Sequence, residues 1–273
     1  MRDQEGHPMK VGLSGIITPS EWSYQETLQK AKDAGYEAFE LCFRDDRDTS
    51  FGSMTDQKIQ DMLKMAEDME IELCAAVGSG ETRPDIMTCD DGVRRQSKDE
   101  IKRILEVVKK FGIDTWLLVP GRVSEECHYD DAYYNARDAL LDLAPFAEEI
   151  GVTIAVEYVW NRFLLSPMEF ARFLGEIGSS RVGLYFDTGN MVIQSYPEQW
   201  VKIVGPGVKK VHFKDFKRQG YEWKPLLEGD VDFPAVMAEL RNIGYDDALI
   251  SEVSPSIESL EATALKIRKI MKM

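Results

Sequence analysis

The stretch YNARDALLDLAPFAEEIGVTIAVEY, residues 134–158, contains the unit from which the chain is built. Apolar residues in its first part recur at the three- and four-residue spacing of an amphipathic helix, and Gly151 follows as a helix-ending residue. Its second part, VTIAVEY, is an apolar run of strand length that ends near a carboxylate, Glu157. The stretch therefore predicts a helix, a short turn and a buried strand in succession.

The same unit recurs from one end of the chain to the other. Further helical patterns at 25–35, 99–112 and 232–244 also end on glycine. Strand-like runs occupy 9–17, 38–43, 71–78, 115–121, 152–158, 182–187, 208–214 and 248–253. Because strands that alternate with helices pair in parallel, the pattern indicates an α/β fold.

Two α/β architectures fit this alternation, an open doubly wound sheet and a closed barrel. The segment GLSGIITPSEW after the first strand lacks the GxGxxG fingerprint of an open dinucleotide-binding sheet. Eight units in 273 residues match a single (β/α)8 TIM barrel, with its active site at the C-terminal ends of the strands. We expect one barrel domain at 9–273 after an N-terminal tail at 1–8.

The overall charge and the cysteines limit the function classes. A net charge of −15 argues against nucleic-acid binding, which needs a basic surface. No apolar run approaches the length that crosses a bilayer, and the N-terminus lacks the apolar core of a secretory signal. The four cysteines show no CxxC spacing, so we expect reduced thiols in a cytoplasmic protein with no membrane partner.

Four consecutive strands, the fifth to the eighth, end on side chains that can bind a metal. These residues are Glu157, Asp187, His212 and Glu252. Each alone has a simpler interpretation, as a carboxylate that caps the next helix or a histidine in the core. Their succession on adjacent strands favours one mixed oxygen and nitrogen site, suited to Mn²⁺, Mg²⁺, Co²⁺ or Zn²⁺.

Such a site also predicts a type of chemistry. Two carboxylates on either side of a substrate carbon can remove a proton from one face and return it to the other. A metal that holds the neighbouring oxygens stabilises the enediolate between these steps.

Five motifs in the second half of the chain resemble one family, the xylose isomerase-like TIM barrels of sugar and sugar-phosphate isomerases and epimerases. This family includes the ketose 3-epimerases and the pentulose-phosphate 3-epimerases. The motifs are AVEYVWNRF (155–163), GLYFDTGNM (183–191), KVHFKDFKR (210–218), LLEGDVDF (226–233) and LISEVSP (249–255). The first half of the chain is similar to the family mainly in its barrel pattern.

The resemblance implies an activity and a set of residue roles. It implies an enzyme that isomerises or epimerises a ketose or ketose phosphate through a cis-enediolate held by one divalent ion, with Mn²⁺ as the first choice. Glu157, Asp187, His212 and Glu252 would be the metal ligands, and Glu157 and Glu252 also the acid/base pair. Arg218 matches an arginine that contacts substrate oxygens, and Lys214 is a further substrate-binding candidate.

Two departures from the free-ketose 3-epimerases leave the substrate open. Leu164 follows the NRF motif where those enzymes have a glutamate, and Asn190 stands where they have a substrate-binding histidine. We keep Asn190 as a substrate-binding candidate. Gly78-Ser79-Gly80 and Gly121-Arg122 are weak candidates for binding a phosphate group, and the simpler interpretation of both is a turn.

Aromatic residues near the strand ends are candidates for the substrate walls, Trp116 foremost, although packing explains such residues as well. The resemblance further implies a small-molecule carbohydrate substrate and a homodimer or homotetramer.

Three alternatives share the barrel. An endonuclease-IV-type DNA repair enzyme needs several histidines and a DNA-binding surface, which three histidines and a charge of −15 do not supply. A metal-dependent lyase or dehydratase on a keto-inositol or 3-keto-glycoside resembles the chain equally well in fold and ligands. A non-catalytic sugar-binding barrel would predict a degraded ligand set, whereas all four ligand types are present in order.

Overall fold

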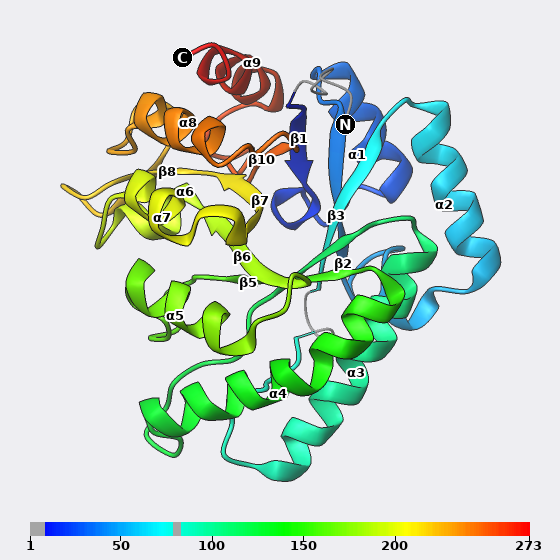
Figure 1. Ribbon diagram of the computed structural model, residues 1–273. Helices are drawn as coiled ribbons and strands as arrows, with labels where there is room; N and C mark the ends of the chain where they lie inside the picture. The colour runs from blue at the N-terminus through cyan, green and yellow to red at the C-terminus, as the bar shows by residue number, and fades with distance from the viewer. Residues whose placement is uncertain (1–8, 79–82) are drawn as a thin grey trace, which may run out of the picture.

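The computed structural model describes residues 9–78 and 83–273, in which eight parallel strands close into a barrel surrounded by helices (Figure 1). The strand order around the ring is β1-β10-β7-β6-β5-β4-β3-β2, and β1 pairs with β2 to close it. The predicted (β/α)8 barrel is confirmed. The tail predicted for residues 1–8 lies outside the described residues.

Every barrel strand lies within the range predicted for it. The strands are β1 (Val11–Ser14), β2 (Ala38–Phe43), β3 (Glu72–Gly78), β4 (Thr115–Leu118), β5 (Thr153–Glu157), β6 (Val182–Asp187), β7 (Val208–Phe213) and β10 (Leu249–Ser251). β1 ends three residues before the predicted position 17 because the chain turns into a 3₁₀ helix, η1 (Gly15–Ile17). The Ser14 hydroxyl caps this helix by accepting the N–H of Ile16.

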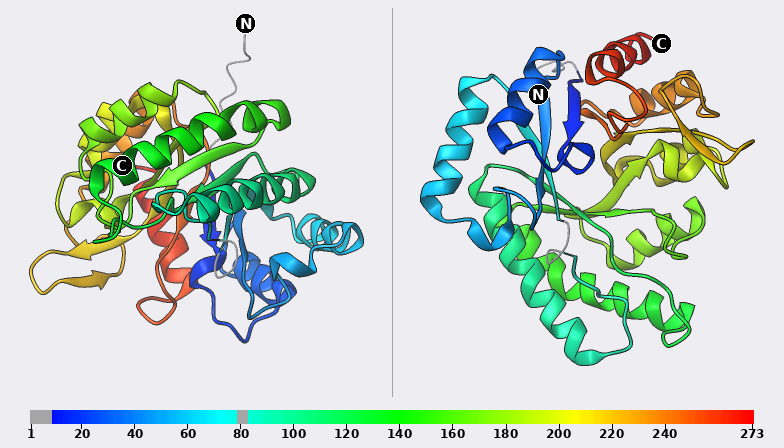
Figure 2. Two further views of the ribbon diagram at one scale, coloured as in Figure 1. Left: turned by 90° about the horizontal axis from the view of Figure 1, so that it is seen from below. Right: turned by 180° about the vertical axis from the view of Figure 1, so that it is seen from behind.

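Helices cover the outside of the barrel (Figures 1 and 2). They are α1 (Tyr24–Asp33), α2 (Asp56–Asp68), α3 (Asp91–Lys110), α4 (Tyr129–Ile150), α5 (Pro167–Ile177), α6 (Thr188–Val192), α7 (Pro197–Val204), α8 (Phe233–Asn242) and α9 (Leu260–Ile270), with short 3₁₀ helices at η2 (Phe51–Ser53) and η4 (Gly205–Gly207). Within the described residues, no helix has the length and apolar character needed to cross a bilayer.

The predicted helix-ending glycines adopt the left-handed backbone that favours this residue. Gly35, Gly112, Gly151 and Gly244 have φ between 72° and 86°. Each lies just after a helix and before the next strand, so the sequence pattern correctly marks four of the αβ connections.

Side chains of the strands alternate between the helix layer and the barrel interior. The interior layer is made mostly of small and medium apolar residues, among them Ala38, Ala75, Ala155 and Ile250. Lys210 shares this interior position but forms ion pairs with Asp247 and Asp114, which precede β10 and β4. Its ammonium therefore lies at the N-terminal opening of the barrel.

An antiparallel hairpin that the sequence analysis did not predict follows β7. It consists of β8 (Asp215–Lys217) and β9 (Glu222–Lys224), and it projects from the body of the molecule (Figures 1 and 2). The buried Asp215 carboxylate fixes its base by accepting the backbone N–H groups of Gly229 and Val231. The strands are only three residues long, which leaves too short a pattern for detection from sequence.

The prediction of four reduced cysteines is wrong for two of them. Cys89 and Cys127 form a disulfide with a Cα–Cα distance of 5.4 Å, whereas Cys42 and Cys74 are free and buried. The pair was not apparent because 38 residues separate its members. It forms because the β3–α3 and β4–α4 loops meet above the barrel, where the N–H of Ile86 donates to the carbonyl of Pro120.

Candidate active site

The four strand-end residues meet at the C-terminal mouth of the barrel. Glu157 ends β5, Asp187 ends β6, His212 lies near the end of β7, and Glu252 follows β10. Each can offer one ligand atom such that all four atoms lie within 4.8 Å of one another. The strand register brings them together, since Asp187 is paired with His212 and the N–H of Glu252 donates to the carbonyl of Phe213.

Three buried atoms of this group have no well-aligned hydrogen bond to a described residue, although the two carboxylate oxygens among them form ion pairs with Lys214. They are Nδ1 of His212, Oδ2 of Asp187 and Oε2 of Glu252. Nδ1 lies 3.0 Å from the Glu252 oxygen and 3.8 Å from the Asp187 oxygen. Buried polar atoms normally have partners, so lone pairs that converge in this way suit a cation. Three carboxylates and one imidazole fit a divalent metal that prefers oxygen and nitrogen ligands.

Lys214 brings a positive charge into the same group. Its Nζ lies 3.0 Å from Oδ2 of Asp187 and 2.9 Å from Oε2 of Glu252. Burial lowers the pKa of Lys214, but the two carboxylates raise it by more, so its pKa lies above the ordinary value. The ammonium therefore stays charged and offsets part of the negative charge of the site.

Asn190, in the short helix α6, orients two of the carboxylates. Its backbone N–H donates to Oδ1 of Asp187 at 2.7 Å, which turns Oδ2 toward the other ligand atoms. Its side-chain Nδ2 donates to Oε1 of Glu157 at 3.2 Å. Burial raises the pKa of Asp187 to about 7; Lys214 opposes this rise, and Glu252 and Glu157 add to it.

Glu40 was not among the predicted site residues, although it lies directly beneath His212. This fully buried carboxylate on β2 approaches Nε2 of His212 at 3.0 Å and accepts the hydroxyls of Ser14 and Tyr185. Because a carboxylate only accepts, the neutral imidazole carries its proton on Nε2 and turns the lone pair of Nδ1 toward the metal ligands. Burial lowers the pKa of His212, but Glu40 and Glu252 raise it by more.

One feature of the sequence marks Glu40 in retrospect. It interrupts the apolar strand AFELCF at a position with the same parity as Ala38 and Cys42, which face the barrel interior. A carboxylate at such a position needs partners.

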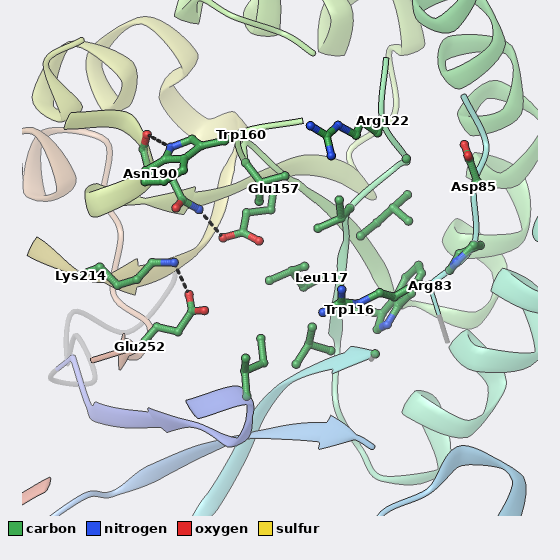
Figure 3. A pocket seen from close by; sticks show the side chains of 18 residues that line it. Arg83, Asp85, Trp116, Leu117, Arg122, Glu157, Trp160, Asn190, Lys214 and Glu252 are labelled. Atoms are coloured by element: carbon green, nitrogen blue, oxygen red, sulfur yellow. Dashed lines mark hydrogen bonds and ion pairs between the residues drawn. The ribbon is translucent and has the colours of Figure 1, made fainter. Parts of the chain in front are cut away.

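A cavity of about 580 Å³ opens beside the carboxylates. Figure 3 shows Glu157, Asn190, Lys214 and Glu252 on one side of it and Arg83, Asp85 and Arg122 on the other. The volume falls within the range of small-molecule sites, which is about 300–1,000 Å³.

Trp160 borders the cavity and packs against the ring of Trp223 in the β8–β9 hairpin. The rings of Trp160 and Trp223 are stacked with centroids 5.4 Å apart, and Trp160 donates its indole N–H to the carbonyl of Asn190. Gly189 permits this arrangement, because a Cβ there would lie 2.6 Å from Cβ of Lys214 and 2.8 Å from the Trp223 ring. The hairpin thus contributes part of the site.

Two predicted substrate-binding residues lie outside the centre of this arrangement. Arg218 is not among the residues that line the cavity, and its guanidinium donates to the carbonyls of Val192 and Ser195. Trp116 borders the cavity but belongs mainly to the apolar layer between strands and helices. Asn190 and Lys214, by contrast, both line the cavity.

Comparisons with known proteins agree with the fold. The family model described as "Xylose isomerase-like TIM barrel" matches residues 28–270. An uncharacterised protein of Methanocaldococcus jannaschii is 23% identical, covering 97% of this chain and 88% of its own. An L-ribulose-5-phosphate 3-epimerase of Escherichia coli is 24% identical, covering 96% and 93%.

Solved structures with the same fold include two sugar epimerases. A D-psicose 3-epimerase superposes with a TM-score of 0.80 at 18% identity, covering 97% of this chain and 100% of its own. A 3-keto-D-glucoside 4-epimerase from E. coli does so with a TM-score of 0.78 at 17% identity, with the same coverage.

Proposed function

The chain belongs to the xylose isomerase-like TIM barrel family, and on this premise we propose that it is a divalent-metal-dependent sugar epimerase or isomerase acting on a ketose or ketose phosphate. The observation that carries the proposal is the convergence of ligand atoms from Glu157, Asp187, His212 and Glu252 next to a cavity of sugar size. The epimerase names of relatives that align along almost the whole chain support the same class.

In the proposed reaction two glutamates exchange protons with one substrate carbon. Glu157 and Glu252 both line the cavity, on different strands, so they can approach the carbon from different directions. The Asn190 amide holds Glu157, and the Lys214 ammonium holds Glu252 as an anion ready to accept a proton. A divalent ion, when bound, polarises the carbonyl oxygen and stabilises negative charge on the enediolate.

Glu157, Asp187, His212 and Glu252 would hold the ion, and we propose Mn²⁺ because three of the four donors are carboxylates. Glu40 would accept the Nε2 proton of the neutral His212 imidazole and so fix the tautomer and ring orientation that present Nδ1 to the metal. Lys214 and Asn190 would also contact substrate oxygens, since both line the cavity.

The Cys89–Cys127 disulfide weighs against the cytoplasmic location expected from sequence, because disulfides are rare in cytoplasmic proteins.

The proposal is tested by proton exchange in D₂O with added Mn²⁺ across a panel of ketoses, ketose phosphates and keto-inositols. We expect deuterium at the carbon next to the carbonyl and a product of the same mass apart from that label. Loss of water would instead indicate the dehydratase alternative.

Glu157→Gln and Glu252→Gln should each abolish exchange, since an amide cannot accept the proton. Activity that survives both substitutions would contradict the two-carboxylate mechanism. Metal analysis of each variant separates loss of the acid/base group from loss of the ion.

A further inference from the structure

The wall of the cavity that faces away from the metal ligands carries two arginines, Arg83 and Arg122. They come from different loops, Arg83 from the one after β3 and Arg122 from the one after β4. Figure 3 shows both side chains extending from this wall toward the cavity that Glu157 and Glu252 border from the other side. Arg83 was not predicted from sequence, whereas Arg122 belongs to the Gly121-Arg122 turn that the sequence offered as a weak candidate for binding a phosphate group.

Neither guanidinium makes a hydrogen bond or an ion pair with any residue in 9–78 or 83–273. Arg44, Arg137 and Arg268, by contrast, pair with nearby carboxylates. Asp85 lines the same wall, but its Oδ1 accepts the backbone N–H groups of Met87 and Thr88 and forms no ion pair with either arginine. Two cationic groups thus border the cavity without a partner among the residues that the structure describes.

Hydrogen bonds and a disulfide connect the two loops that carry the arginines. Asn161 donates its side-chain N–H to the carbonyl of Gly121 and accepts the N–H of Val123 on its own carbonyl, so both neighbours of Arg122 are held. The N–H of Ile86 donates to the carbonyl of Pro120, and the Cys89–Cys127 disulfide joins the same two loops. The two arginines are therefore presented from one connected support.

The charges at the two ends of the cavity differ. At the metal end, the carboxylates of Glu157, Asp187 and Glu252 are offset by Lys214 and a divalent ion, and Glu40 beneath them adds one negative charge. An anionic substrate group finds no compensation there. At the other end, two guanidiniums and the single Asp85 carboxylate leave a net positive charge, and a phosphate monoester carries about −1.5 to −2 at neutral pH.

From this arrangement we propose that Arg83 and Arg122 form an anion subsite that binds the phosphate group of a ketose phosphate. The proposal rests on the proposed function and names its substrate class. Guanidinium groups suit this role because their N–H donors match phosphate oxygens in bidentate pairs. A neutral sugar would leave both arginines unpaired in the complex, whereas a phosphate ester would place its reacting carbons toward the glutamates.

The test compares a free ketose with the corresponding phosphate ester in wild-type protein, Arg83→Gln and Arg122→Gln. We expect each substitution to lower kcat/KM for the phosphate ester by about 10- to 100-fold, the range for loss of one charge-assisted interaction. The activity on the free ketose should change by less than about 3-fold. Arg103→Gln on α3, an exposed arginine outside the cavity, is the matched control and should behave as wild type.

Binding of inorganic phosphate, measured by calorimetry, tests the subsite without chemistry. Wild type and Arg103→Gln should bind it, and Arg83→Gln and Arg122→Gln should bind it at least about 10-fold more weakly, with unchanged metal content. Equal phosphate binding in all four proteins, or absence of binding in wild type, would overturn the subsite. Proton exchange on free ketoses with no preference for the phosphate ester would also overturn the anion subsite but would leave the proposed function intact. Absence of proton exchange on every sugar tested would overturn only the proposed function.

Discussion

Glu40→Gln tests whether the carboxylate beneath His212 prepares the site for a metal. Glu40 accepts three donors, the Ser14 and Tyr185 hydroxyls and Nε2 of His212. Glutamine offers a single oxygen, and its NH₂ group faces at least one of these donors, so the imidazole loses its fixed orientation or its fixed tautomer. We expect the affinity for Mn²⁺ to fall about 10- to 100-fold, as for other partners of metal-binding histidines.

Calorimetric titration of the metal-free protein with Mn²⁺ measures this directly, and it needs no substrate. Ser14→Ala is the matched control, because it removes one donor but leaves the carboxylate and its contact with His212; its affinity should stay within about 3-fold of wild type. Thermal unfolding in a chelator shows whether Glu40→Gln still folds. Wild-type Mn²⁺ affinity in a folded Glu40→Gln protein would refute the reasoning. Should that variant fail to fold, Tyr185→Phe must keep Mn²⁺ binding, because it spares the carboxylate.

Two other predictions concern the support of the site. Gly189→Ala should lower both the midpoint of thermal unfolding and the activity, because the alanine Cβ would overlap Lys214 and the Trp223 ring. A variant with normal stability and activity would show that the hairpin can shift without consequence. A thiol reagent added to the native, unreduced protein should find no rapidly reacting cysteine. Burial raises the pKa of Cys42 to about 12 and also raises the pKa of Cys74, so neither thiol ionises readily. Cys89 and Cys127 are joined in the disulfide and have no free thiol. Two rapidly reacting thiols would contradict the disulfide.

The sequence predicted the barrel and the clustering of the four candidate metal ligands for the same physical reason. In a closed parallel barrel every strand delivers its last residues to one face, so the location of a strand end determines that of its side chain. Glu157, Asp187 and His212 needed only the correct strand boundaries, and the apolar runs before them defined these boundaries well. Glu252 follows by the same rule although β10 is only three residues long.

Glu40 and the hairpin could not be predicted in this way. Strand alternation places Glu40 inside the barrel, but its partner His212 lies 172 residues away, and no local pattern connects them. The two-stranded hairpin depends on the buried Asp215, whose partners Gly229 and Val231 lie beyond the hairpin in sequence. In both cases a polar group in an apolar setting is the only local sign, and its partners depend on the tertiary fold.

The strand pattern does not determine the position of the two arginines on the cavity wall. Arg83 and Arg122 lie on loops, whose geometry depends on contacts such as that between Asn161 and Gly121, so their position follows from the folded structure alone. The carboxylate end of the cavity rests on strands. The loops instead place the charges that a substrate must match, and under the proposed anion subsite those charges would favour a phosphorylated ketose over a neutral one.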